Sequence, residues 1–482
     1  MPQELSCTDR TKALVTESAS GTAGDQGKDV LTKDAKSVRG SFISNVAAVL
    51  GGQAACAAVA LATEICYARL LGPGGRGQIS LCLMAIAFGV LAGGMGGEGT
   101  IILWSADPRR RSTVWLPAVL LWGLLGCILT CSLWGVVYWK WHPTFLRSIN
   151  PTLAVIVLLS IPAGVLLDYQ IGMFVGEERF RTRASVAIAA QAGGLAGFAV
   201  LLFFGRSAEN ALWGNLLGIL AGGGIAAAIL TDSFRGFWRL GAARNSLLPT
   251  LSFAMRGHFG NVASFFNYRL DVFVVNYYLD STQVGLYALG VVISEALWQI
   301  PGAAAVALFP RTARTIDEGA TNFTCLIMRQ VLLIATVSAI AIAIGSWLFL
   351  PLIFGERFRP SIAVVWLLLP GTLALSLGRV GVSDLAGRGK SGYSSVFSLS
   401  ALVVTIALDL ILIPRMGIQG ASLASSAAYL TNTILILAAL KYELKVTWRS
   451  LLVPTYAELA SYQHAWSRFR EWMKPATALP SS

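Results

Sequence analysis

Two charged residues lie inside a stretch that is expected to form a membrane-spanning helix. Arg269 is near the middle of the stretch 259–279, and Asp271 follows two residues later. Residues two apart on an α-helix point about 200° apart, so these side chains are not expected to neutralise each other. A charge at the centre of a bilayer costs about 2.5–3.5 kcal/mol on insertion scales and therefore faces a cavity or a partner. Arg269 thus needs a partner on another helix or an anionic ligand.

The stretch around Arg269 predicts which side chains share its helix face. Asn261 and Phe265 precede it at intervals of four residues, so all three line one stripe of the helix. Asp271 lies on another stripe with Asn267. A second apolar segment begins after a short turn at 280–283.

The composition identifies the setting as a membrane. The chain has 482 residues, of which 55% are hydrophobic and 13% charged, and its mean hydropathy is +0.65. Soluble proteins have about 25% charged residues, so half that fraction over this length indicates a polytopic membrane protein with one membrane domain. The net charge of +12 follows the membrane topology, so we expect no nucleic-acid partner.

Twelve apolar segments are long enough to cross a bilayer core of about 30 Å. The sequence therefore predicts an all-α polytopic membrane protein with about twelve transmembrane helices. We place them near 43–68, 78–104, 113–139, 151–175, 185–205, 211–231, 259–279, 284–310, 326–354, 361–384, 393–414 and 419–440.

The basic residues predict the orientation. With the N-terminus inside, 26 of the 37 Lys and Arg residues are cytoplasmic, 8 are outside, and Arg269, Arg329 and Arg379 lie within spans. This asymmetry fits the positive-inside rule with both termini cytoplasmic. The predicted parts are a disordered cytoplasmic tail (1–41), an N-lobe (42–231, spans 1–6), a cytoplasmic linker (232–258), a C-lobe (259–440, spans 7–12) and a cytoplasmic tail with an amphipathic helix (441–482).

Cysteine and histidine give no sign of a cofactor. The seven cysteines are scattered without a CxxC pair, and the three histidines form no metal-like cluster. No GxxxxGK[ST] phosphate-binding motif occurs. We expect neither a metal site nor a cofactor.

The two halves contain one short stretch of weak sequence similarity to each other, which we call the internal echo. RLLGPGGRG (69–77), which leaves span one, aligns with YYLDSTQVG (277–285), which leaves span seven, at an offset of 208 residues. In both, an aliphatic run ends at a leucine, a turn follows, and a glycine opens the next helix. Because six is an even number of spans, the halves share one orientation and are expected to be related by an axis along the membrane normal.

Several stretches together resemble Wzx-type polysaccharide flippases (O-antigen flippases) of the multidrug/oligosaccharidyl-lipid/polysaccharide exporter superfamily. They are ARLLGPGGRG (68–77), the region 267–312 with its RLD, VGLYA and FPRT landmarks, IPRMGIQGA (413–421) and GEERFRTR (176–183). The resemblance covers roughly residues 40–440. It implies two six-helix lobes around a central cavity, alternating access, and a lipid-linked oligosaccharide diphosphate as cargo in a bacterial inner membrane.

The cargo that the resemblance implies gives the intramembrane arginines a role. A diphosphate in a low-dielectric region needs fixed cations, and guanidinium binds phosphate bidentately. Arg269 is the first candidate, with Phe265 able to stack on a sugar ring and Asn261 on the same stripe. Arg379 is the second, and Arg69, at the outer end of span one, is a third. Each can instead form a structural ion pair, and Arg69 can snorkel to the interface.

Intramembrane carboxylates are candidates for coupling transport to a proton or Na⁺. Glu64, Asp271 and Glu295 lie on helices that the resemblance puts around the cavity. The alternative is that they pair with an intramembrane arginine, and the sequence leaves both open. The other buried acids are Glu98, Asp168 and Asp409, of which Asp409 is expected to be a packing or cap residue.

The leading hypothesis is a transporter, not an enzyme, that flips a lipid-linked glycan from the inner to the outer leaflet. Its partners would be the glycan substrate, membrane lipids and a polysaccharide polymerase or export machinery. The first alternative is a cation-coupled multidrug antiporter of the same superfamily. A membrane glycan polymerase or acyltransferase is a further alternative, but such enzymes generally have a large outside loop, and here every outside connection is short.

Overall fold

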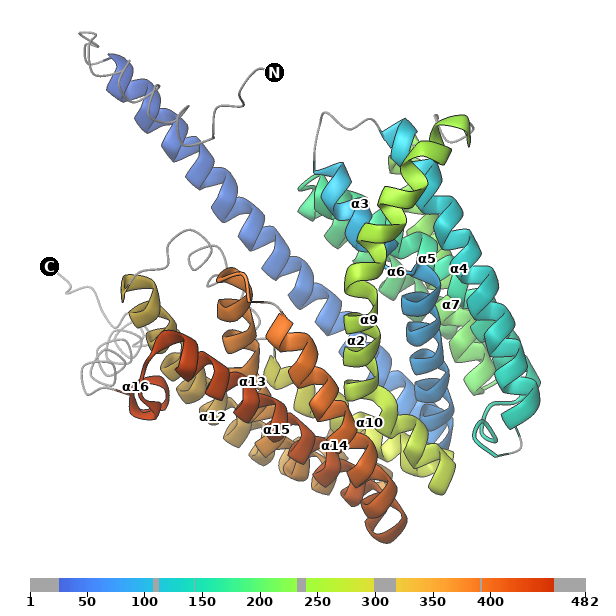
Figure 1. The fold of residues 1–482 in the computed structure, drawn as a ribbon. Coiled ribbons are helices and arrows are strands. Elements are labelled where there is room, and N and C mark those ends of the chain that lie inside the picture. Colours follow the sequence, from blue (N-terminus) through green and yellow to red (C-terminus); the bar gives the residue numbers. More distant parts are fainter. Residues whose placement is uncertain are drawn as a thin grey trace, which may run out of the picture.

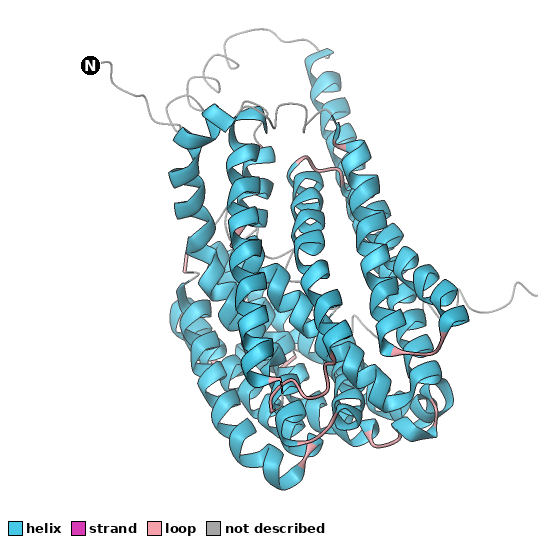
Figure 2. Cartoon of the chain, turned by 90° about the vertical axis from the view of Figure 1, so that its right-hand side faces the viewer, coloured by secondary structure: helices cyan, strands magenta, loops and turns pink. Residues whose placement is uncertain are grey.

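The regular secondary structure of the chain consists of helices alone where the structure describes it. The computed structural model describes residues 26–106, 112–142, 144–231, 240–298, 318–390 and 392–454, and no strand occurs among them (Figure 2). The all-α prediction is confirmed.

The helices divide into two sets along the chain. The first set consists of α2 (Gln26–Gly94), α3 (Gly97–Ser105), α4 (Ser112–Trp141), α5 (Pro151–Gly176), α6 (Phe180–Leu201), η1 (Leu202–Phe204) and α7 (Ala208–Ile229). The second set consists of α9 (Leu240–Tyr278), α10 (Ser281–Glu295), η2 (Ala296–Trp298), α12 (Glu318–Phe354), η3 (Glu356–Phe358), α13 (Ser361–Gly387), α14 (Gly392–Met416), α15 (Ile418–Leu444) and α16 (Trp448–Leu452). We call these sets the N-lobe and the C-lobe.

Each of the twelve predicted spans has a helical counterpart. Nine of the described helices are long and apolar enough to cross a membrane. One of them, α2, contains span one and most of span two, separated by a kink at Gly72, whose φ of 67° favours glycine. Span seven lies within α9, and α10 corresponds to the first part of span eight, of which residues 299–310 lie outside the described residues. The prediction of about twelve transmembrane helices is confirmed.

The boundaries of the predicted tail and linker differ from the observed helices. Helix α2 begins at Gln26 and therefore includes residues 26–41 of the predicted tail, and α9 begins at Leu240, inside the predicted linker. Residues 1–25, 232–239 and 455–482, the last with the predicted amphipathic helix, lie outside the described residues.

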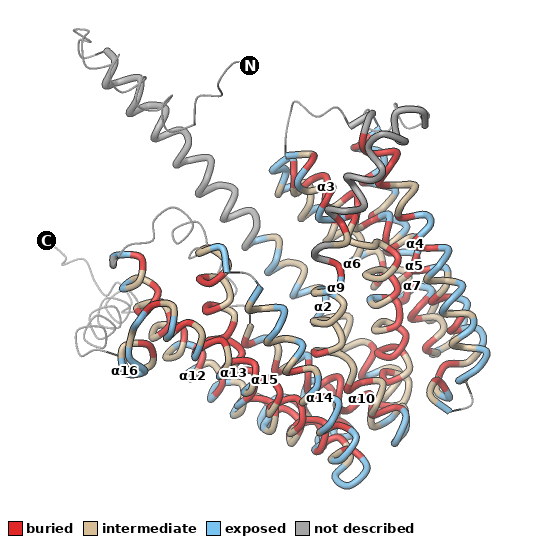
Figure 3. The backbone as a smooth tube through the Cα atoms, viewed as in Figure 1, coloured by how far each residue is buried: buried red, intermediate tan, exposed pale blue. Residues whose placement is uncertain are grey.

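The two lobes form a V in the view of Figure 1. They converge at the end that carries the turns at 144–150, 279–280, 355–360 and 417, which we call the convergent end. They splay apart toward the opposite end, where α4 begins and α13 ends. Helix α9 packs against α4 of the N-lobe and α14 of the C-lobe and so connects the two arms. Buried residues concentrate on α13 and α15, whereas α6, α12 and α14 turn mostly exposed, apolar faces outward (Figure 3).

Span two is interrupted, which the sequence analysis did not predict. Helix α2 ends at Gly94, and α3 begins at Gly97 after two residues with positive φ, Met95 (44°) and Gly96 (73°). The Tyr169 hydroxyl donates a hydrogen bond to the Gly94 carbonyl at 2.7 Å, and the Trp122 indole donates to the Met95 carbonyl at 3.3 Å. These bonds hold the broken helix in place.

The lobes meet at the convergent end through two glycines. A Cβ atom on Gly77 would lie 1.7 Å from the Ser281 carbonyl oxygen, and one on Gly285 would lie 2.0 Å from the Pro73 carbonyl oxygen. Positions 73 and 281, like 77 and 285, are 208 residues apart, so each lobe presents the same site to the other. This reciprocity matches the internal echo and is what a twofold relation between the halves requires.

Candidate functional site

The intramembrane arginine of α9 forms a bidentate ion pair with an acid on α10. Arg269 Nη1 and Nη2 donate to Glu295 Oε1 and Oε2, each at 2.8 Å. The side chains are 25% and 16% exposed, so the pair is accessible although it lies within the membrane domain. The partner of Arg269 is therefore on another helix, and Asp271 of the same helix is not part of the pair.

A second guanidinium lies in the same region. The Arg379 guanidinium of α13 lies 4.5 Å from the ring centroid of Trp298 in η2, and it attracts Glu295 electrostatically. The described residues offer Arg379 no ion-pair partner of its own. Tyr268, Trp298 and Tyr429 pack together with ring centroids 5.5–6.2 Å apart.

We call this group the arginine–aromatic cluster. It consists of two guanidiniums, one carboxylate and three aromatic rings: Arg269, Arg379, Glu295, Tyr268, Trp298 and Tyr429. Within it, the positive charges outnumber the negative charge by one. Such a group can hold an anion between the guanidiniums and present flat apolar faces beside it.

The other members of the predicted stripe have separate neighbours. Phe265 packs against Phe88 of α2, with ring centroids 5.5 Å apart. Asn261 lines a cavity on the N-lobe side of α9. The stripe from Asn261 to Arg269 therefore runs from this cavity toward the arginine–aromatic cluster along one face of α9.

Asp271 lies in a second, more deeply buried polar cluster between α9, α10, α14 and α15. It accepts hydrogen bonds from the Tyr287 hydroxyl and from Ser425 Oγ at 2.9 Å. Asp409 of α14 is fully buried and is repelled electrostatically by Asp271, and neither of its carboxylate oxygens has a partner among the described residues. Thr405, one turn before Asp409, donates to Asn267 Oδ1 at 3.1 Å. Two carboxylates thus lie in one buried site. The sequence analysis named Asp271 as a candidate for coupling and expected Asp409 to be a packing or cap residue.

Glu64 and Arg69 lie toward the convergent end, away from the arginine–aromatic cluster. Glu64 pairs at 2.7 Å with Arg76, which is 1% exposed and also donates to Ser80 Oγ and to the Gly285 carbonyl oxygen across the lobe boundary. Arg69 donates through Nε to the Ile353 carbonyl at 2.8 Å and through Nη2 to the Leu352 carbonyl, at the end of α12. Both arginines therefore connect the N-lobe to the C-lobe.

Arg76 is a residue that the sequence analysis missed. The sequence analysis assigned Arg76 to the connection 69–77, because the apolar segment of span one ends at residue 68. The sequence feature that could have revealed it is its position next to Gly77, the glycine that aligns with Gly285 in the internal echo. Close backbone contact at that glycine buries the neighbouring side chain.

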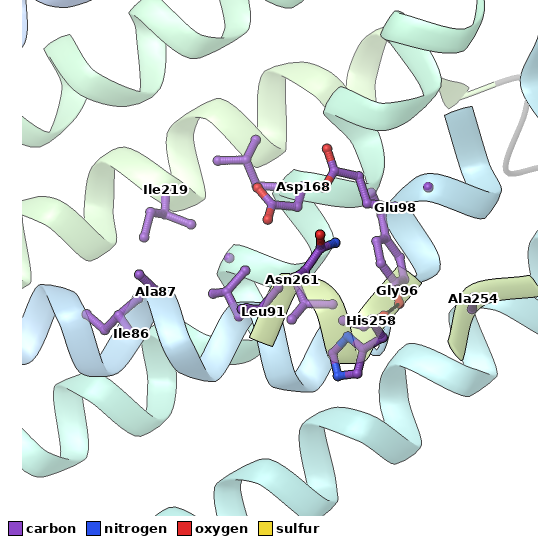
Figure 4. A pocket seen from close by; sticks show the side chains of 17 residues that line it. Ile86, Ala87, Leu91, Gly96, Glu98, Asp168, Ile219, Ala254, His258 and Asn261 are labelled. Atoms are coloured by element: carbon purple, nitrogen blue, oxygen red, sulfur yellow. Dashed lines mark hydrogen bonds between the residues drawn. The ribbon is translucent and has the colours of Figure 1, made fainter. Parts of the chain in front are cut away.

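A cavity of about 760 Å³ lies between α2, α3, α5, α7 and α9. Its lining is largely apolar, but Glu98, Asp168, His258 and Asn261 contribute polar groups to it (Figure 4). Glu98 and Asp168 are two of the buried acids that the sequence analysis named without assigning a role.

The comparisons with known proteins agree on one type of membrane protein. The profile of a family described as "Polysaccharide biosynthesis protein" matches residues 42–316. A "Putative O-antigen transporter" from Shigella flexneri is 26% identical over 170 residues, which is 34% of this chain and 40% of that relative. The chain therefore spans well under half of this curated relative.

Two solved structures have the same fold. "Lipid II flippase MurJ, inward closed conformation" matches with a TM-score of 0.66 and 13% identity over 91% of this chain and 94% of that chain. An inward-facing "multidrug resistance MATE family transporter of the MOP superfamily" matches with a TM-score of 0.57 and 13% identity over 80% of this chain and 94% of that chain. At these identities the likeness concerns the fold. Since the family profile matches more than half of its length and nine of the described helices can cross a membrane, the chain belongs to the polysaccharide biosynthesis protein family and is a multi-pass membrane protein.

Proposed function

We propose that this protein moves a lipid-linked oligosaccharide diphosphate across the bacterial inner membrane for surface polysaccharide synthesis. The observation that carries the proposal is the arginine–aromatic cluster, because it joins two guanidiniums to three aromatic rings within the membrane domain of a polysaccharide biosynthesis protein. Guanidinium forks fit phosphate oxygens, and aromatic faces suit the apolar faces of sugar rings.

The ion pair supplies a way to load and release the cargo. With no cargo, Glu295 satisfies Arg269 through two charge-assisted hydrogen bonds of 2.8 Å. A diphosphate presents the same paired oxygens and can replace the carboxylate, while Arg379 contributes the second cation. Glu295 thereby keeps Arg269 paired when the site is empty.

The lobe arrangement supports loading from the cytoplasmic side. The contacts of Gly77, Gly285, Arg76 and Arg69 close the convergent end, while the lobes separate toward the other end (Figure 1). With the orientation that the basic residues indicate, the separated end faces the cytoplasm and both termini are cytoplasmic. The lipid-linked precursor and the neighbouring membrane lipids would enter there, and a polymerase or export partner would receive the product on the other side.

The proposal is tested in a deletion strain. We expect lipid-linked glycan precursor to accumulate in the inner leaflet and wild-type protein to clear it, as measured by extraction and leaflet-specific labelling of the precursor. If no precursor accumulates and the strain instead becomes drug-sensitive, the multidrug antiporter takes the place of the flippase. The observation that favours this second candidate is the fold that the chain shares with a multidrug resistance MATE family transporter.

For coupling, we propose Asp271 together with Asp409, with Glu64 and Glu295 serving their arginine partners. Two adjacent buried carboxylates cannot both stay charged unless a proton or a cation compensates one of them. Asp271→Asn is expected to leave glycan binding intact and to abolish the dependence of transport on the cation gradient, measured in proteoliposomes with imposed Na⁺ or pH gradients. Unchanged gradient dependence in Asp271→Asn would place the coupling group elsewhere, and Glu356→Asn, at an exposed turn, is the control.

A further inference from the structure

The N-lobe cavity lies beside the helix that carries the proposed diphosphate contact. Its volume of about 760 Å³ is within the range of about 300–1,000 Å³ that small-molecule sites usually have. Asn261 lines the cavity, and Arg269 lies eight residues further along the same unbroken helix, α9. Eight residues of an α-helix span about 12 Å. Sugars that are attached to a diphosphate at Arg269 can therefore reach the cavity.

Four polar side chains project into this cavity from α3, α5 and α9 (Figure 4). They are Glu98, Asp168, His258 and Asn261. His258 is only 8% exposed, yet its Nδ1 has no hydrogen-bond partner among the described residues. Nor do the side chains of Glu98, Asp168 and Asn261 form a hydrogen bond with another residue in the part of the chain that the structure describes. A buried ring nitrogen without a partner is costly, so this lining is suited to a ligand with hydrogen-bonding groups.

Three phenylalanine rings pack together where α2 and α9 meet. Phe265 lies one turn after Asn261 and one turn before Arg269 on α9. Its ring centroid is 5.5 Å from that of Phe88 in α2 and 6.0 Å from that of Phe266. All three side chains are only half-buried. Aromatic rings offer large, flat apolar faces, which suit the apolar faces of sugar rings. A glycan that extends from Arg269 to the cavity therefore passes a surface on which a sugar ring can stack.

The charge of the lining favours one class of sugar. Glu98 and Asp168 bring two carboxylates, which accept hydrogen bonds from the hydroxyl and amide groups of a sugar. Arg183 of α6 attracts Glu98 electrostatically, but it is not part of the described lining of the cavity. A uronate or another acidic sugar would be repelled by the two carboxylates, and an apolar surrounding strengthens this repulsion. The cavity therefore suits sugars without a negative charge.

We propose that this cavity, which we call the sugar site, binds the sugars next to the diphosphate and selects uncharged sugars there. Glu98 and Asp168 accept hydrogen bonds from the sugar hydroxyls, and His258 and Asn261 complete the set of hydrogen-bonding groups. This role rests on the proposed function, because it takes the cargo to be a glycan diphosphate. The residues that hold the diphosphate and those that recognise the glycan are thus different, and their contributions can be separated by substitution.

The test compares two lipids that differ only in the glycan. One is the lipid-linked precursor extracted from the deletion strain, and the other is the polyprenyl diphosphate that remains when its sugars are removed. Their dissociation constants for the purified full-length protein are measured by native mass spectrometry in detergent. The wild-type protein is expected to bind the precursor at least about tenfold more tightly, which is what one hydrogen bond to a charged group contributes.

Substitutions distinguish the sugar site from the diphosphate contact. Glu98→Ala/Asp168→Ala is expected to bind both lipids alike, while its affinity for the polyprenyl diphosphate stays that of the wild type. Arg269→Ala is expected to weaken the binding of both lipids by the same factor. Asn261→Ala alone should reduce the preference for the precursor, which keeps the test decisive if the double variant does not fold. Glu356→Ala, at an exposed turn, is the matched control and should keep the full preference.

The selection by charge is tested with polyprenyl diphosphates that carry glucose or glucuronate, which differ only at C6. The wild-type protein is expected to bind the glucose lipid at least about tenfold more tightly, because like charges repel in the sugar site. Glu98→Gln/Asp168→Asn keeps polar groups but removes both charges, so it is expected to bind the two lipids alike.

The outcomes separate a failure of the sugar site from a failure of the proposed function. If the polyprenyl diphosphate binds but the precursor is not preferred, or if the preference survives Glu98→Ala/Asp168→Ala, the sugar site is wrong and the proposed function stands. If the wild-type protein binds neither lipid, the proposed function is wrong and the sugar site with it. Equal binding of the glucose and glucuronate lipids by the wild-type protein would refute the selection of uncharged sugars.

Discussion

Arg269→Ala is expected to abolish export while the protein still inserts into the membrane, and adding Glu295→Gln is expected not to restore export. In the proposed site the guanidinium binds the diphosphate, so its loss removes contacts that no other residue replaces. Truncating one member of a desolvated, hydrogen-bonded charge pair costs about 2–5 kcal/mol, which corresponds to at least a thirtyfold loss of affinity. Arg269→Lys keeps the charge but not the fork and should restore export only in part.

The double variant separates this role from a purely structural one. If Arg269 only neutralised Glu295, then Arg269→Ala would fail because an unpaired carboxylate remains in the membrane domain. Glu295→Gln would remove that carboxylate, and export would return. Precursor clearance in the deletion strain measures the outcome, and Arg359→Ala, at an exposed pair near the convergent end, controls for the loss of an arginine. Export by the double variant at the wild-type level would contradict the proposed diphosphate contact.

The architecture was largely predictable because membrane insertion acts on local properties of the sequence. An apolar stretch of about twenty residues must form a helix in a bilayer, so hydropathy located the helices that are long and apolar enough to cross a membrane. The break at Met95 and Gly96 was not predictable in this way. Glycines such as those at 93–97 are common in membrane helices, and whether they interrupt one depends on partners such as Tyr169 and Trp122 on other helices.

The candidate site was only partly predictable, since ion pairs join residues distant in sequence. Helical geometry showed that Arg269 and Asp271 point in different directions, but it could not identify which other buried acid pairs with Arg269. That partner is Glu295, which is 26 positions away. Asp409 was expected to be a packing residue because it is near the end of its span, yet α9 and α14 bring it beside Asp271. Arg76 was counted with the loops, although the contact between the lobes buries it completely.

Gly77→Ala and Gly285→Ala are each expected to block export by preventing closure of the convergent end. The added methyl group would lie 1.7 Å or 2.0 Å from a carbonyl oxygen of the other lobe, and backbone cannot move aside as a flexible side chain can. Overpacking of this kind costs about 1–3 kcal/mol, which shifts an equilibrium between closed and open forms about 5–150-fold. Because the two contacts are reciprocal, the two variants should have similar effects.

The distance between the lobes measures this effect directly. Spin labels at Thr144 and Arg359, both exposed near the convergent end, should move apart in either glycine variant relative to the unsubstituted protein. Gly135→Ala is the matched control, because nothing lies within 4 Å of the Cβ that it would add. Wild-type export together with an unchanged distance in Gly77→Ala would mean that this contact does not control closure. An increased distance with wild-type export would mean that closure at this end is not required for transport, and the alternating-access part of the proposal would then be wrong.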